Sequence, residues 1–134
     1  MLTRASCQGS KSLRATYETF LTRTNWGMAT YARRMLEILP GLETMCARLS
    51  VRGMTSHARL LLSLVDNRNA SPILITPLAS DGYMIQYGLI HSSGVSPEFT
   101  QRGFATTPED ALSLIAVAIE RSGWGRLPTS PSAA

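Results

Sequence analysis

Apolar positions are most clearly delimited near the end of the chain, where an apolar run lies between two helix-boundary signals. Thr107 suits the N-cap, because its hydroxyl accepts a hydrogen bond from a backbone N–H of the first turn, and Pro108 suits the first helical position. Glu109 and Asp110 place negative charge near the positive end of the helix dipole, and Gly123 suits the left-handed conformation that ends many helices. The pattern predicts one helix between these signals.

This predicted C-terminal helix, Pro108–Ser122, is apolar on nearly all sides. Residues 111–119 include a single polar side chain. So wide an apolar surface is typical of a helix that is buried on more than one side. We predict that Leu114, Ile115 and Ile119 belong to the core.

The segment before this helix favours strands. Residues 73–75 and 83–90 are rich in Ile, Tyr and Met, and the Asp81-Gly82 pair between them is a turn signal, so we predict a hairpin. The prolines that flank the first of these runs restrict it to a sheet edge or to an irregular segment. A third strand is expected over residues 98–104.

The first half of the chain shows helical spacing. Apolar residues recur at intervals of three and four in segments 13–24, 28–39 and 42–49. Pro40-Gly41 is expected to separate the last two of these helices. The leucine-rich segment 55–66 is predicted to be a fourth helix.

Together these elements predict one α+β domain over residues 13–124. Its helical part, residues 13–67, packs with a small two- to three-stranded antiparallel sheet and a buried C-terminal helix, which occupy residues 71–123. A chain of 134 residues with 44% apolar residues can form such a domain. Residues 1–12 are expected to be a flexible leader, and residues 125–134 a flexible tail.

One arrangement within the helical part would bind DNA. Segments 42–50 and 55–66, joined by a turn over residues 51–54, have the lengths of a helix-turn-helix, and the predicted hairpin would follow as a wing. The second of these helices begins with polar residues where apolar ones should face inward, and leucines fill the face that should contact base edges. We therefore favour an ordinary antiparallel helix pair.

The order helix, three strands, helix between Met54 and Arg121 resembles two small modules in a general way. One is the double-stranded RNA-binding domain. The other is an antitoxin type with a three-stranded sheet and one helix, which Gly82-Tyr83 and the segment 104–111 resemble. The final helix of the RNA-binding module usually opens with lysines, whereas this one opens with acidic residues that repel phosphate. No family is assigned on these residues.

Positive charge is concentrated in the first half. Residues 1–68 hold ten Arg or Lys against four Asp or Glu, a net charge of +6, whereas residues 69–134 carry −2. All of these cations except Lys11 are arginines, which suit bidentate contacts with phosphate or carboxylate, although a GC-rich coding sequence would produce the same bias. The residues predicted to bind nucleic acid or an acidic partner are Arg33, Arg34, Arg48, Arg52 and Arg59.

No pattern typical of catalysis or of metal binding is present in the sequence. His57 and His91 do not form a ligand spacing with each other or with Cys46. Cys46 lies on an apolar face of a predicted helix, which favours a buried small hydrophobe over a nucleophile. We therefore expect no catalytic residue, no metal and no cofactor.

Cysteine usage and hydropathy bear on the compartment. Cys7 and Cys46 are too few for a disulfide framework, which favours the cytoplasm. No apolar run reaches the ~20 residues that cross a membrane. A transit peptide at the start of the chain is the alternative to a flexible leader.

These observations favour a non-catalytic binding protein that engages nucleic acid, or a nucleoprotein complex, through an Arg-rich helical face. The alternative is an inhibitor or adaptor that binds a protein through a sheet edge or an apolar patch. For that alternative Tyr83 and Trp124 are the candidate contact residues. The sequence leaves the partner and the oligomeric state open.

Overall fold

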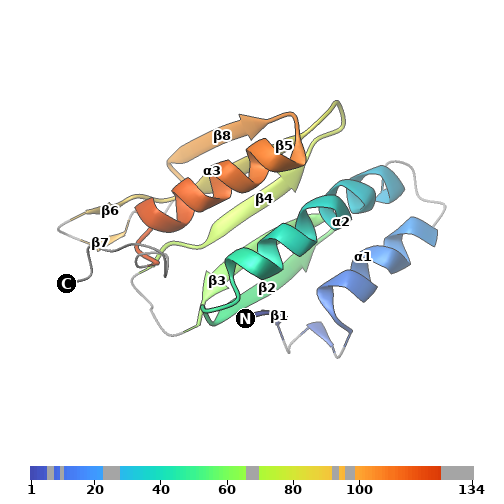
Figure 1. Cartoon of the computed structure of the whole chain (residues 1–134), viewed down its shortest axis with the longest axis horizontal. Coiled ribbons are helices and arrows are strands. Elements are labelled where there is room, and N and C mark those ends of the chain that lie inside the picture. Colours follow the sequence, from blue (N-terminus) through green and yellow to red (C-terminus); the bar gives the residue numbers. More distant parts are fainter. Residues whose placement is uncertain are drawn as a thin grey trace.

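The computed structural model describes residues 1–5, 8–9, 11–22, 28–65, 70–91, 94–95 and 99–124. These residues form three helices on one side of a six-stranded sheet (Figure 1). The helices are α1 (Leu13–Thr22), α2 (Met28–Met45) and α3 (Pro108–Arg121). In sheet order, the strands are β1 (Leu2–Arg4), β2 (Val51–Ser56), β3 (Arg59–Leu64), β4 (Ile73–Pro77), β5 (Tyr83–Tyr87) and β8 (Gln101–Ala105). A separate two-stranded hairpin consists of β6 (Ile90–His91) and β7 (Gly94–Val95).

The sheet is an antiparallel meander with one parallel strand added at its edge. Each strand from β2 to β8 is antiparallel to the next in sheet order. β1 pairs with β2 in parallel, so that Leu2 lies opposite Val51 and Arg4 opposite Gly53. A parallel pair needs a long crossover, which α1 and α2 provide.

β1 lies within residues 1–12, for which the sequence predicts a flexible leader. Its pairing with β2 is continued by Ala5, whose N–H donates to the Gly53 carbonyl oxygen at 2.8 Å. The predicted tail, residues 125–134, lies outside the described residues.

The sheet is larger than predicted: the α+β class is confirmed, but the small sheet of two or three strands is wrong. Residues 51–64, expected as a turn and a helix, form the β2–β3 hairpin. The leucine run misleads because short apolar runs look alike in buried helices and strands. In the structure Leu60 and Leu62 face the helices, while Leu61 points to the opposite side. His57, in the hairpin turn, has a φ of 56°. This left-handed conformation is more usual for Gly or Asn, so the sequence contains no clear turn signal here.

Two further expectations fail with this hairpin. Segments 42–50 and 55–66 form neither the favoured antiparallel helix pair nor a helix-turn-helix, since only the first contains helix and most of the second is strand. The order helix, three strands, helix is also absent from the described residues, because five antiparallel strands precede α3. The general resemblance to RNA-binding and antitoxin modules is therefore not supported.

α2 continues through Pro40, where a break between two helices is expected. Pro40 is exposed, and the Thr44 hydroxyl donates to its carbonyl oxygen at 3.1 Å. Gly41 lies against α3, and a Cβ at this position would overlap the side chain of Leu112. Packing against α3 thus outweighs two local helix-breaking residues.

The predicted C-terminal helix is confirmed as α3. The Thr107 hydroxyl accepts the Asp110 N–H at 3.1 Å, and Gly123 follows the helix with a φ of 85°. Of the residues predicted for the core, Ile115 and Ile119 are fully buried, whereas Leu114 is half-buried beside Gly103.

The predicted β4–β5 hairpin is also confirmed, with a φ of 99° at Gly82 in its turn. The expectation that β4 is an edge strand is wrong, because β4 lies between β3 and β5. Pro72 precedes this strand and Pro77 is its last residue. Neither proline therefore removes a hydrogen bond from the interior of the ladder.

The core lies between the helices and one face of the sheet. Alternate residues of the strands point to this face. The fully buried side chains of the strands include Leu60, Leu62, Ile73, Ile75, Tyr83 and Ile85, and those of the helices include Tyr17, Met35, Ile38, Leu39, Leu42, Ile115 and Ile119.

We predict that Ile115→Ala lowers the free energy of unfolding by about 2–5 kcal/mol, because it leaves a cavity between α3 and the sheet. Val117→Ala is the matched control on the same helix: Val117 is exposed, so a change within about 0.5 kcal/mol is expected. Urea denaturation measures both variants. Equal midpoints for the parent and Ile115→Ala would contradict the burial of α3.

We predict that Gly82→Ala destabilises the β4–β5 hairpin. Gly82 has positive φ, and a Cβ there would collide with the carbonyl oxygen of Ala105. Gly103→Ala is the milder control, because its Cβ would meet only the end of the Leu114 side chain, at 3.1 Å. Thermal melts should rank Gly82→Ala well below Gly103→Ala, and the reverse order would contradict this turn geometry.

Candidate functional site

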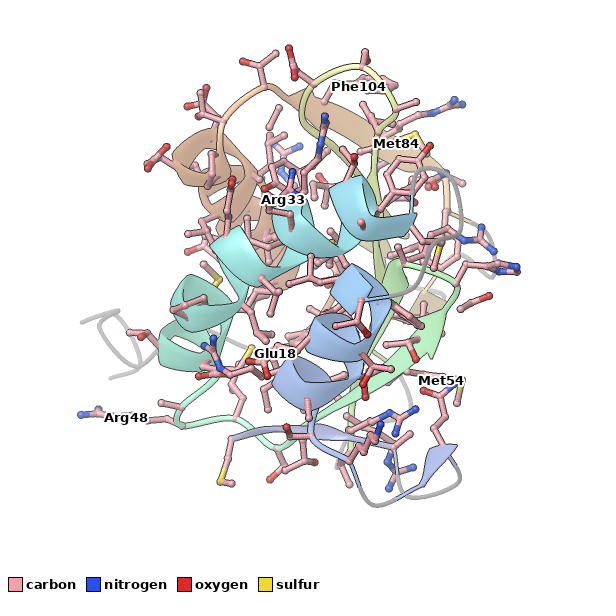
Figure 2. The ribbon with its side chains drawn as sticks, turned by 90° about the vertical axis from the view of Figure 1, so that its right-hand side faces the viewer. Glu18, Arg33, Arg48, Met54, Met84 and Phe104 are labelled. Carbon is pink, nitrogen blue, oxygen red and sulfur yellow. The ribbon has the colours of Figure 1, made fainter. Side chains whose placement is uncertain are left out.

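The face of the sheet away from the helices is the candidate site, since no helix or strand among the described residues covers it. Figure 2 shows Met54, Met84 and Phe104 on this side, and Arg33 and Arg48 on the helical side. We call this surface the open face. Its side chains on the five antiparallel strands are Arg52, Met54, Ser56, Arg59, Leu61, Ser63, Leu74, Thr76, Met84, Gln86, Arg102 and Phe104.

The open face is positively charged. It carries Arg52, Arg59 and Arg102, which are all exposed. Six of the seven described Asp and Glu residues lie on helices, and the seventh, Asp81, lies in the β4–β5 turn. Within the described part of the chain the only ion pair joins Arg34 to Asp81. The arginines of the open face are therefore not neutralised by a described carboxylate.

Apolar side chains lie between these arginines. Met54 pairs across the strands with Leu61, and Leu61 with Leu74, which makes one continuous apolar row. Met84 pairs with Phe104 on the edge strand, and the Phe104 side chain is 64% exposed. An exposed aromatic ring beside cationic side chains is typical of a binding surface.

The structure brings together two of the five predicted arginines. Arg52 and Arg59 share the open face, although they lie on strands and not on the predicted helical face. Arg33 lies on α2, and Arg48 follows that helix, so neither joins this surface (Figure 2). Arg102 completes the set and was not predicted, because it lies in the half of the chain with negative net charge. Arg102 and Phe104 are two residues apart on a strand, so their spacing indicated that both side chains lie on the same face of the sheet.

Arg34, the fifth predicted arginine, fastens α2 to the β4–β5 turn. One of its Nη atoms donates to the Leu78 carbonyl oxygen at 2.8 Å, and the other lies 3.5 Å from a carboxylate oxygen of Asp81. Its own carbonyl oxygen accepts the Tyr83 hydroxyl at 2.7 Å. These contacts give Arg34 a structural role in the folded chain.

Tyr83 and Trp124, the candidate contacts for a protein partner, both lie in the core. Tyr83 is 1% exposed. Trp124 is 3% exposed, and its indole N–H donates to the Ser71 carbonyl oxygen at 2.6 Å. Neither side chain is presented to a partner on the surface of this structure.

The described residues offer little for nucleophilic or metal chemistry. Cys46 is a buried free thiol, and burial raises its pKa to about 11, so the reactive thiolate is scarce at neutral pH. His57 is exposed in the β2–β3 turn. No group of three or more His, Cys, Asp or Glu side chains among the described residues is arranged to hold a metal ion.

Comparison with known proteins adds no family to this description. The chain matches no family model, and neither a curated protein nor a solved structure matches it significantly. No helix among the described residues has both the length and the apolar character that a membrane crossing requires. The function is therefore inferred from the described side chains alone.

We predict that Tyr83 makes the fold sensitive to alkaline pH. Burial raises its pKa to about 12, with a smaller contribution from the Glu37 carboxylate, while an unfolded tyrosine titrates near 10. Between these values the unfolded chain loses a proton that the folded chain retains, so stability falls as the pH rises through this window.

In Tyr83→Phe this fall should be shallower than in the parent, as measured by urea denaturation from pH 8 to pH 11. Part of the fall should persist, because burial also raises the pKa of Tyr17. Tyr31→Phe, which changes a half-buried tyrosine of α2, is the control. Identical pH profiles for Tyr83→Phe and the parent would contradict this assignment.

Proposed function

We propose that this is a non-catalytic binding protein whose open face binds single-stranded nucleic acid. One observation carries the proposal: the open face gathers three arginines, while the described strands contain no carboxylate. Polyanions gain most from such a surface, because each phosphate that meets an arginine releases condensed counterions. A cytoplasmic location is part of the proposal.

The dimensions of the open face suit an extended strand of nucleic acid. Arg52 and Arg102 lie on β2 and β8, four strand spacings apart, which corresponds to about 19 Å. Arg59 lies on β3, between them. The three guanidinium groups can therefore contact different phosphates of one strand.

Single-stranded nucleic acid is favoured over a duplex by shape and by side-chain chemistry. The major groove of DNA admits a helix or a narrow two-stranded ribbon, whereas the open face is a broad surface of five strands. Unpaired bases stack on exposed aromatic rings, and Phe104 offers such a ring beside Arg102. Leu61, Leu74 and Met84 add an apolar floor against which bases can pack.

A protein partner is the second candidate, and the apolar row Met54–Leu61–Leu74 favours it. Methionine adapts its shape to a partner, and exposed apolar side chains that form a continuous row are typical of protein interaction sites. On this reading an inhibitor or adaptor would bind through the same face, and the arginines would contribute mainly to the rate of association. The two candidates differ in how strongly binding depends on salt and on the arginines.

We predict that Arg52→Ala/Arg59→Ala weakens binding to a fluorescent single-stranded oligonucleotide of mixed sequence. The log–log salt slope should flatten by about 0.7 for each lost phosphate contact. Arg33→Ala/Arg48→Ala removes the same charge from the helical side and is the matched control, with a much smaller expected effect. Fluorescence anisotropy over a salt series measures the affinities, and thermal melts establish that both variants fold.

We predict separately that Phe104→Ala weakens the same binding by about 5- to 150-fold, which corresponds to a stacking contribution of about 1–3 kcal/mol. Phe104→Leu keeps an apolar side chain but removes the aromatic face, so it should show a similar loss. If Phe104→Leu binds like the parent, apolar contact rather than stacking is involved, which favours the protein partner. Absence of binding to single-stranded DNA and RNA at low salt would exclude the proposal.

A further inference from the structure

A second basic surface lies on the helical side of the sheet, at the edge where the chain begins. A cleft of about 510 Å³ opens between β1 and the start of α1, which is within the size range of small-molecule sites. Among the residues that line it are the cations Arg4, Lys11 and Arg14 and a single carboxylate, Glu43. The charged side chains of the described lining therefore have a net positive charge, which favours the binding of anions.

The frame of this cleft is held by specific hydrogen bonds. The Gln8 side-chain amide donates to the Thr55 carbonyl oxygen at 2.6 Å, and its oxygen accepts the Thr55 N–H at 2.7 Å, so that Gln8 extends the pairing along the edge of β2. The Ser12 hydroxyl accepts the Ala15 N–H at 3.1 Å and caps α1. Leu13 is buried against Gly53, where a Cβ would lie 2.8 Å from a Leu13 methyl carbon. Both walls of the cleft are therefore fixed to β2.

Arg4 has unused hydrogen-bonding capacity at this cleft. Its Nε is buried and finds no partner among the described residues. One of its Nη atoms makes only a long contact, 3.5 Å, with the Lys11 carbonyl oxygen. Buried polar groups are nearly always hydrogen-bonded, so the unpaired Nε leaves donor capacity on an arginine that lines the cleft.

The two other cations can complete a site for an anion. Lys11 and Arg14 are exposed, and the Lys11 ammonium donates to the Thr19 hydroxyl at 3.1 Å, a neutral partner that leaves its charge uncompensated. The planar guanidinium group of arginine can donate two parallel hydrogen bonds to a phosphate, and the lysine ammonium group adds a compact positive charge. Both groups are common in phosphate recognition.

We propose that this cleft binds a small phosphate-bearing anion through Arg4, Lys11 and Arg14. The site is independent of the proposed nucleic-acid function, because it lies on the opposite side of the sheet from Arg52 and Arg59. Arg4 supplies the half-buried, directional contact, while Lys11 and Arg14 neutralise the remaining charge at the mouth of the cleft.

The test uses the full chain at constant ionic strength, with inorganic phosphate and pyrophosphate as probes and acetate as the weaker anion. Both phosphates should raise the melting temperature and shift the backbone amide resonances of Gly9, Leu13 and Gly53 saturably. Lys11→Gln/Arg14→Gln should weaken binding at least tenfold, and the exposure of both side chains makes a folding defect unexpected. Arg4→Gln should abolish binding if that variant folds.

Arg33→Gln/Arg48→Gln and Arg52→Gln/Arg59→Gln are the matched controls, and both should bind the probes like the parent. Saturable shifts that disappear only in the cleft variants support the proposal. The absence of saturable shifts at millimolar pyrophosphate would overturn it. Equal losses in all three double variants, or shifts that map to the open face, would also overturn it, because they would indicate a general response to charge or a different site.

Discussion

Burial of one face of the sheet beneath α2 and α3 is the constraint on which the rest of the structure depends. Leu60, Ile75 and Ile85 come from neighbouring strands and are fully buried under the helices, where Ile38 and Ile115 are buried from the opposite layer. Each such side chain contributes roughly 1.5–3 kcal/mol when it leaves water. Because strand side chains alternate, the same burial directs the intervening residues to the open face.

Polar contacts at the margins of this core hold the helices to the sheet. At one end, Arg34 and Tyr83 link α2 to the β4–β5 turn. At the other, Ser71 accepts the Trp124 indole N–H at its carbonyl oxygen and donates its own N–H to Ser122, so that the end of α3 is fastened to the residues before β4. Arg34, Tyr83 and Trp124, which the sequence suggests as binding residues, thus make hydrogen bonds within the folded chain.

The two layers differ in the charges that they carry, because the helices bear both signs and the strands only one. The described carboxylates lie on the helices and in one turn, whereas the strands carry only arginine among their charged residues. Opposite sides of the same sheet edge therefore present two basic surfaces, the open face with Arg52 and Arg59 and the cleft with Arg4 and Lys11. Both face solvent, so ionic strength controls the reach of their fields. Their shapes differ, since one is a broad surface of five strands and the other is a cleft of small-molecule size.

The sequence by itself determined the features that depend on neighbouring residues. The cap at Thr107 predicted α3 and the Asp81-Gly82 turn predicted the β4–β5 hairpin, because capping and turn chemistry act within about four residues. The β2–β3 hairpin, the continuity of α2 through Pro40 and the grouping of Arg59 with Arg102 were decided only by the tertiary structure. These features depend on which strand pairs with which, in what register, and on which face the helices cover, and none of these choices is encoded in a short window of sequence.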